Sequence, residues 1–172
     1  MSIFTSVERA SAENTTEVMS LLVNTAEWLL MKGSTQWNGL LKGEDSSNTP
    51  EAISRGEVYL FKKDYRVAGM VILMQEPSAW DRDLWGEVSG DHSAIYLHRL
   101  AIDRKFAGQD VGKHIMRWVD GAVPEQLGKH VVRLDCLASI SVLNDFYRDL
   151  GYRNVGEQAN SSGMFSKFQK SV

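Results

Sequence analysis

The sequence lacks the features of a secreted or membrane protein. Cys136 is the single cysteine among 172 residues, so no internal disulfide can form, and the expected compartment is a reducing one, most simply the cytoplasm. No apolar run approaches the roughly 20 residues that a membrane-spanning helix needs. The first residues also show no basic segment followed by an apolar one, as a signal peptide would. We therefore expect a soluble cytoplasmic protein with no membrane partner.

Positive charge is also scarce. Lysine and arginine total 19 against 22 acidic residues, a formal net charge of −3, which argues against a nucleic-acid partner. The hydrophobic fraction of 43% and the length suit one soluble domain, so residues 1–172 are expected to form a single domain. The sequence leaves a homodimer open.

Metal-ligand patterns are absent from the sequence. His92, His114 and His130 are scattered, and together with Cys136 they have no metal-ligand spacing, so no metal is expected. Nothing near Cys136 in the sequence indicates a lowered thiol pKa, which favours a core position over a nucleophilic one.

The first half of the chain predicts helices followed by a strand pair. Apolar residues recur at helical spacing from Thr15 to Leu29, and Gly33 is expected to end that helix. Two short helices are expected at residues 36–41 and 50–55, with a polar loop between them at 43–50. Two strands joined by a hairpin follow at 57–62 and 67–74.

Residues 76–92 are predicted to form an acidic loop. The segment holds five acidic residues and one arginine, so its net charge is 1 − 5 = −4. If this loop borders an active site, it favours a cationic small molecule; the simpler interpretation is an ordinary solvated loop.

The second half predicts a strand, a helix and a second strand, at residues 94–102, 111–122 and 130–137. Such a unit requires a parallel strand pair with a right-handed crossover. A last helix at 142–150 and two strands at 152–157 and 164–169 are expected to close an antiparallel edge. The expected fold class is a mixed α/β sheet flanked by helices.

The junction between the strand at 94–102 and the helix at 111–122 predicts an anion site. Gly108 and Gly112 allow close backbone approach to a ligand, and the helix N-terminus supplies unpaired N–H groups and partial positive charge. Four basic side chains lie near that end: Lys105, Lys113, His114 and Arg117. A pyrophosphate ligand such as coenzyme A would suit it, whereas an ordinary glycine loop is the alternative. The P-loop and the G-x-G-x-x-G dinucleotide motif are both absent.

This segment resembles the acyl-CoA-binding core of the GNAT superfamily of N-acetyltransferases, in which a Leu-x-Val strand end precedes [Arg/Gln]-x-x-Gly-x-[Gly/Ala]. Two departures are Ala107, in place of Arg or Gln, and Asp110, in place of the first motif glycine. The resemblance implies a twisted, largely antiparallel sheet with a central splayed parallel pair. It also implies that acetyl-CoA contacts the strand end and loop, namely Leu100, Ala101, Ile102, Ala107, Gly108, Gln109, Asp110, Val111, Gly112 and Lys113.

Two further segments are similar to the same family. Asn144, Tyr147 and Gly151 match its last conserved helix. By resemblance Asn144 and Tyr147 both contact the cofactor, and Tyr147 is also the general acid for the leaving sulfur. A weaker similarity around Trp37 implies that this ring lines the acceptor cleft. Packing roles are the alternatives for Tyr147 and Trp37.

The resemblance implies transfer of an acetyl group from acetyl-CoA to a primary amine of a small molecule, directly in a ternary complex. His98, two residues before Leu100, is the candidate general base, with Glu76, Glu87 or a water chain as alternatives. The Leu100 N–H is the candidate oxyanion donor. Because Ala107 and Asp110 depart from the motif, a non-catalytic acyl-CoA sensor with the same fold is the alternative function.

Overall fold

The computed structural model describes residues 2–172, which divide into two compact units. The first unit contains the chain up to Leu73 and His98–Ile115, and the second contains Met74–Leu97 and Met116–Val172. Strand β4 (Ala94–Ile102) and helix α4 (Val111–Ala122) each contribute residues to both units.

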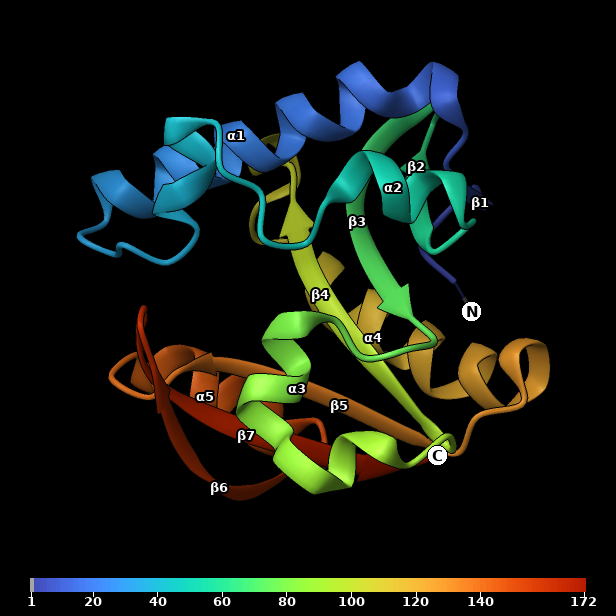
Figure 1. Ribbon diagram of the computed structural model, residues 1–172. Coiled ribbons are helices and arrows are strands. Elements are labelled where there is room, and N and C mark those ends of the chain that lie inside the picture. Colours follow the sequence, from blue (N-terminus) through green and yellow to red (C-terminus); the bar gives the residue numbers. More distant parts are fainter. Residues whose placement is uncertain (1) are drawn as a thin grey trace. The chain divides into compact units, whose positions relative to one another are not determined.

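The strands are hydrogen-bonded in the order β1-β2-β3-β4-β5-β7-β6 (Figure 1). The pairs β1–β2, β2–β3, β5–β7 and β6–β7 are antiparallel, whereas β4 and β5 are parallel, with Ala94–Tyr96 opposite Val131–Arg133. The predicted mixed α/β sheet, mostly antiparallel with one parallel pair and flanked by helices, is confirmed. The remaining strands are β1 (Ser6–Arg9), β2 (Val58–Lys63), β3 (Arg66–Met74), β5 (Val131–Leu137), β6 (Arg153–Asn160) and β7 (Gly163–Ser171).

Every predicted helix is present; α4 has the predicted bounds, and the ends of the others are shifted by one or a few residues. Gly33 follows α1 with a φ of +83°, as expected of a glycine at a helix end. The helices are α1 (Thr15–Met31), α2 (Thr49–Ser54), α3 (Ala79–Trp85), α4 and α5 (Ser141–Asp149). Shorter turns are η1 (Ala12–Asn14), η2 (Asn38–Lys42), η3 (Gly86–Gly90), η4 (Arg104–Phe106) and η5 (Val123–Leu127).

The acidic segment at residues 76–92 is not the loop that was predicted. It contains α3 and η3, and α3 begins with a capping box. The Ser78 backbone N–H donates to Asp81 Oδ2 at 2.9 Å, and the Asp81 N–H donates to Ser78 Oγ at 3.2 Å. The prediction was wrong because a seven-residue helix is too short for a clear apolar period, although Ser78 and Asp81 have the spacing of a cap.

Strand β1 was also missed. It has four residues, two of them charged, and no apolar alternation, so nothing in its composition predicts a strand. It forms by pairing with β2, with Ser6 opposite Lys62. Just before it, the Phe4 ring packs 5.1 Å from that of Phe61.

Close packing around Gly69 joins β3, the end of β4 and the start of α4 within the first unit. A Cβ atom at Gly69 would lie 2.7 Å from Ile115 Cδ1, 2.9 Å from the Ala101 carbonyl oxygen and 3.2 Å from Ile102 Cδ1. Only glycine fits here without displacing backbone. This contact fixes both the strand and the helix that flank residues 103–110.

In the second unit, helices cover both faces of β7. Trp80 of α3 packs on Phe165 at 5.0 Å, and Tyr147 of α5 packs on Phe168 at 5.8 Å, measured between ring centroids. Residues three apart on a strand point to opposite faces, so α3 and α5 lie on opposite sides of the sheet (Figure 1). Among residues 2–172, no helix has both the length and the apolar composition needed to cross a membrane.

Replacing Gly69 with alanine should lower the free energy of unfolding by about 1–3 kcal/mol, because the new methyl group overpacks against backbone. The matched control is Gly121→Ala on α4, where no atom lies within 4 Å of the new Cβ. That variant should be unchanged or more stable by up to about 1 kcal/mol. Urea unfolding measures both; equal stability of the two variants would contradict the packing role.

Candidate cofactor-binding and catalytic residues

The start of the loop after β4 is hydrogen-bonded to β3. The Asp103 N–H donates to the Ala68 carbonyl at 2.9 Å, and the Asp103 carboxylate accepts the Lys105 N–H at 2.9 Å, which starts the turn η4. Arg104 then stacks on Trp28 of α1, with its guanidinium carbon 4.2 Å from the ring centroid. The loop is therefore tied to β3 and α1 before its exposed part begins.

Two residues with left-handed backbone form the exposed part of the loop. Gly108 has a φ of +79° and Asp110 a φ of +55°, and residues 107–110 are all exposed. Asp110 thus keeps, at the position of the family's glycine, a backbone conformation that favours glycine. Alternating backbone of this kind points successive N–H groups toward one side, as in anion-binding nests.

Helix α4 begins directly after Asp110, whose carbonyl accepts the His114 N–H at 3.1 Å. The N–H groups of Val111, Gly112 and Lys113 lie in the first turn and so have no partner inside the helix. The buried side chain of Val111 anchors this turn to the core. Because the helix dipole adds positive potential, the helix start suits a phosphate.

The Asp110 carboxylate would repel a phosphate, but a lysine of the same turn offsets its charge. Lys113 Nζ lies 3.8 Å from Asp110 Oδ1, and both side chains are mostly exposed. A second cation comes from the β2–β3 hairpin, where Lys63 Nζ donates to Gln109 Oε1 at 2.6 Å. Sequence reasoning missed Lys63 because only the fold brings the hairpin beside Gln109.

The end of β4 carries the other predicted residues of the first unit. His98 and Leu100 are half-buried, Ala101 is buried and Ile102 is half-buried. Arg99, between His98 and Leu100, has a φ of +55°, so the strand is locally irregular next to both. The Asp103–Ala68 bond and the Gly69 contact hold the strand end, so its backbone is fixed when the loop begins.

The Trp37 ring lies beside the guanidinium group of Arg99. The Arg99 guanidinium carbon is 5.2 Å from the Trp37 ring centroid, and Arg99 Nη2 lies 3.3 Å from Asp45 Oδ1. The Arg99 side chain is only 7% exposed. Sequence reasoning missed both Arg99 and Asp45; the available signal was a charged residue in an otherwise apolar strand.

In the second unit, Tyr147 is packed among aromatic rings. Its ring lies 5.8 Å from Phe168, 6.1 Å from Tyr152 and 5.1 Å from Phe146. Burial raises the pKa of the Tyr147 hydroxyl, and Cys136 and Asp135 raise it further. The hydroxyl therefore keeps its proton at neutral pH and can act as a proton donor but not as a base.

The Asn144 side chain, in contrast, is hydrogen-bonded to the backbone of the chain. Its amide group donates to the Ile140 carbonyl at 2.8 Å and to the Leu137 carbonyl at 3.2 Å, which ties the start of α5 to the end of β5. The side chain is buried. Both amide hydrogens are occupied, so only Oδ1 is left for a ligand.

Cys136 has the properties of a core residue. Burial raises the pKa of its thiol to about 12, and Asp135 adds to the increase. A thiol with this pKa is almost entirely protonated at neutral pH and is a poor nucleophile.

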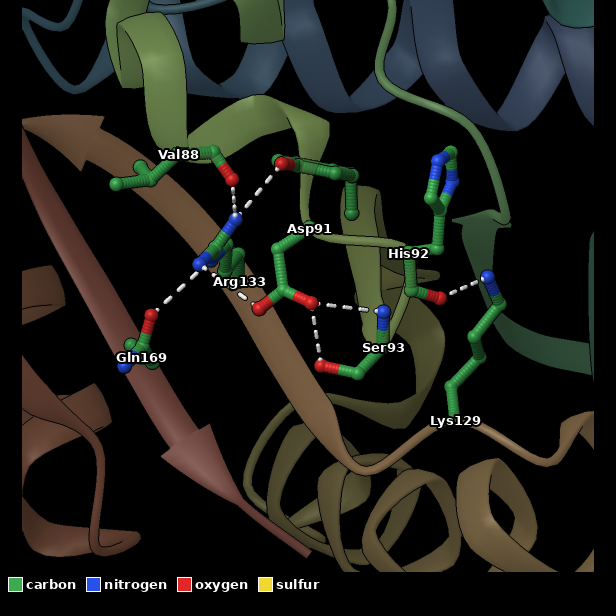
Figure 2. Close-up of polar contacts among 8 residues, drawn as sticks. Val88, Asp91, His92, Ser93, Lys129, Arg133 and Gln169 are labelled. Atoms are coloured by element: carbon green, nitrogen blue, oxygen red, sulfur yellow. Dashed lines mark hydrogen bonds and ion pairs between the residues drawn. The ribbon is translucent and has the colours of Figure 1, made fainter.

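Within the second unit, an arginine on β5 holds the end of the acidic segment in place by hydrogen bonds and an ion pair (Figure 2). Arg133 donates to the Val88 carbonyl at 2.8 Å, to Tyr96 Oη at 2.9 Å and to Gln169 Oε1 at 3.0 Å, and its Nη2 lies 3.5 Å from Asp91 Oδ2. Lys129 adds a hydrogen bond to the His92 carbonyl (Figure 2).

Part of the acidic charge in this segment is used internally. Asp81 is in the cap of α3, and hydrogen bonds from Ser93 together with the charge of Arg133 lower the pKa of Asp91. The other three carboxylates, which include the alternative bases Glu76 and Glu87, are exposed. Less charge is therefore available to attract a cationic acceptor than the sequence total suggests.

Comparison with known proteins agrees with this geometry. Residues 53–167 match the family described as an acetyltransferase (GNAT) domain. A Bacillus subtilis (strain 168) protein named "Uncharacterized N-acetyltransferase YesJ" is 45% identical over 157 residues, which are 90% of this chain and 85% of the relative.

Solved structures show the same fold. A GNAT-family acetyltransferase from Listeria monocytogenes has a TM-score of 0.83 at 33% identity, covering 97% of this chain and 94% of the other. PaiA N-acetyltransferase from Thermoplasma acidophilum, solved in complex with coenzyme A, has a TM-score of 0.70 at 14% identity, covering 97% and 98%.

The chain belongs to the GNAT acetyltransferase family, as its sequence predicted, and it is an acyltransferase enzyme. Members of this family use acetyl-CoA.

Asp110 gives a test of the loop backbone that is independent of any ligand. Asp110→Gly and Asp110→Ala both remove the carboxylate, but only glycine adopts a φ of +55° without a steric penalty. The glycine variant should be more stable than the alanine variant by about 1–2 kcal/mol in urea unfolding. Equal stabilities would mean that residue 110 does not hold a left-handed conformation.

Proposed function

We propose that this enzyme transfers the acetyl group of acetyl-CoA to a primary amine of a small molecule, directly in a ternary complex. The observation that supports this most strongly is the loop at residues 103–113 of a chain that belongs to the GNAT family. The loop has left-handed backbone at Gly108 and Asp110, and it leads straight into the first turn of α4.

The loop fits the phosphates of coenzyme A through its backbone. In our proposal, the N–H groups of Gly108 and of residues 110–113 bind the pyrophosphate, and Lys113 contributes charge. The Gln109 N–H donates to the Phe106 carbonyl at 3.3 Å, so this residue contributes through its place in the loop. Ala107 has no side-chain donor, so backbone groups do most of the binding. Leu100, Ala101 and Ile102 offer main-chain groups to the pantetheine arm, with which an extended ligand can pair like an added strand. Asn144 has Oδ1 available for the same ligand.

The bound thioester supplies an activated acetyl group, and three groups of the chain would act on the reaction. The Leu100 N–H stabilises the negative charge that develops on the carbonyl oxygen. His98 accepts the proton of the attacking amine, and Tyr147 Oη donates a proton to the departing sulfur. The Tyr147 hydroxyl is protonated at neutral pH, as an acid must be, although its raised pKa makes it a weaker proton donor than an exposed phenol.

Direct transfer is supported by the state of the single cysteine. With a thiol pKa of about 12, Cys136 is a poor candidate for carrying the acetyl group as an acyl-enzyme. We propose that the amine attacks the thioester itself, with Trp37 lining the acceptor side. Much of the rate enhancement would then come from holding the two substrates in line.

We further propose that residues 1–172 act as one acetyltransferase domain in the cytoplasm. Two elements support a single domain, because β4 and α4 each contribute residues to both compact units. A homodimer is compatible with this proposal.

A non-catalytic acyl-CoA sensor is the alternative that the sequence left open, although membership of an acetyltransferase family argues against it. It is favoured by Ala107 and Asp110, which replace two residues of the family's phosphate-binding motif. Such a protein would bind acetyl-CoA but would not consume it.

Acetyl-CoA-dependent thiol release with a panel of amines tests the function. We expect release that requires an amine, together with an increase in melting temperature on adding acetyl-CoA. Stabilisation without thiol release for any amine would favour the sensor. Neither stabilisation nor release would contradict both functions.

Replacing Tyr147 with phenylalanine tests the acid. The substitution keeps the aromatic packing and removes only the hydroxyl, so kcat should fall about 10²-fold or more while affinity for coenzyme A changes little. The matched control is Tyr152→Phe, which removes a hydroxyl that lies 3.4 Å from Asp120 Oδ1 and has no catalytic role in this proposal. An unchanged kcat in Tyr147→Phe would remove Tyr147 from the acid role.

A further inference from the structure

Three residues with left-handed backbone gather at one place in the first unit. Among residues 2–172, six non-glycine residues have a positive φ, and they include Trp37 at +65°, Asn48 at +43° and Arg99 at +55°. Trp37 stacks on Arg99, and the Asn48 N–H donates to the carbonyl of Asp45, whose carboxylate pairs with Arg99. Asn adopts this backbone conformation readily, but in Trp37 and Arg99 it costs roughly 1–3 kcal/mol each, and such strain tends to collect at functional sites.

Arg99 is the most unusual of the three because it lies inside a strand. A left-handed residue interrupts the two-residue alternation of β4, and it rotates the peptide group that joins it to the next residue, Leu100. The direction of the Leu100 N–H therefore depends on the conformation of Arg99. That N–H is the group that we propose as the oxyanion donor.

The side chain of Arg99 is held on two sides. Its Nη2 lies 3.3 Å from Asp45 Oδ1 and 3.4 Å from Ser46 Oγ, and its guanidinium carbon lies 5.2 Å from the Trp37 ring centroid. With 7% of its side chain exposed, Arg99 has little freedom to change rotamer. The backbone at residue 99 is thus coupled to a buried anchor.

Asp45, which anchors the Arg99 side chain, is itself held by hydrogen bonds from the backbone. Asp45 Oδ1 also accepts the Ser47 N–H at 3.1 Å, and Asp45 Oδ2 accepts the Thr49 N–H at 2.8 Å. Burial opposes ionisation of Asp45, but the hydrogen bonds from Thr49 and Ser47 and the charge of Arg99 together lower its pKa. The carboxylate is therefore charged at neutral pH and ties Arg99 to the start of α2.

We propose that Arg99 is a positioning residue: its guanidinium, anchored by Asp45 and stacked on Trp37, holds the Arg99–Leu100 peptide with the Leu100 N–H directed at the reacting carbonyl. This inference rests on the proposed function. It also couples that N–H to Trp37, the residue that we propose lines the acceptor side.

A gain in folding stability does not explain well why Arg99 is buried as an ion pair on left-handed backbone. Buried ion pairs often contribute little net stability, because the cost of desolvating both charges offsets their attraction. Glycine would adopt the same φ without strain. Burying a charged side chain on strained backbone is thus better explained by a requirement for a fixed peptide orientation.

The test uses Arg99→Gly in the full chain, because glycine tolerates the backbone conformation and removes only the anchor. We expect kcat to fall about 10- to 100-fold, less than for deleting an oxyanion donor outright. The KM for acetyl-CoA and the calorimetric Kd for coenzyme A should stay within about threefold, since the phosphate loop is untouched. Guanidinium ion at millimolar concentration should restore part of kcat in this variant and none in the wild type.

The matched control is Arg55→Gln, also in the first unit. Arg55 Nε lies 2.6 Å from Glu57 Oε1, whose side chain is 8% exposed, so the variant breaks an ion pair to a buried carboxylate just before β2. It should keep kcat within about twofold of the wild type. If Arg99→Gly does not fold, Asp45→Asn provides the same test with an intact backbone: a lower kcat at unchanged coenzyme A affinity supports the proposal.

Two results would overturn the positioning role. One is a kcat within twofold of the wild type in Arg99→Gly, or in Asp45→Asn where that variant is needed. The other is an equal loss of kcat in Arg99→Gly and Arg55→Gln without guanidinium rescue, which would indicate a purely structural effect. Failure of the proposed function is a different outcome, because then the wild type itself shows no coenzyme A binding or no turnover.

Discussion

The close approach of β3 to the end of β4 is the constraint on which the candidate cofactor site depends. It needs glycine at position 69, because any Cβ there would meet the Ala101 carbonyl and Ile115. The Asp103–Ala68 hydrogen bond then fixes where the loop leaves the sheet, and buried Ile115 fixes where α4 begins. Between these two points, residues 104–110 adopt one path, so backbone geometry is set by packing underneath the loop.

This arrangement explains how the loop can differ from its family's motif and keep its shape. Asp110 retains the positive φ of the glycine it replaces, and Lys113 lies close enough to offset its charge. Ala107 contributes no polar side chain, but the first-turn N–H groups of α4 do not depend on residue identity. The capacity to bind a phosphate therefore resides mainly in backbone and helix dipole, with Lys63 and Lys113 as nearby cations.

The periodic spacing of apolar residues made the elements around the candidate cofactor site predictable from the sequence. The β4 strand and the α4 helix were predicted at their observed bounds, because an apolar strand and a one-sided apolar helix flank a glycine-containing turn. Strand β1 and helix α3 were not predictable in this way. Strand β1 forms by pairing with β2, whereas α3 depends on its cap and on the stacking of Arg133 on Trp85. The left-handed conformation of Arg99 has no local sequence signal, since its partners Asp45 and Trp37 are more than 50 residues away.

We propose that the backbone N–H groups of Gly108 and of residues 110–113 bind the phosphates of coenzyme A. Titrating the ¹⁵N-labelled protein with coenzyme A and following amide chemical shifts tests it most directly. We expect the largest shifts at Gly108 through Lys113, with smaller changes elsewhere in the first unit. Saturable binding that leaves these six amides unshifted would contradict it, and so would the absence of any binding.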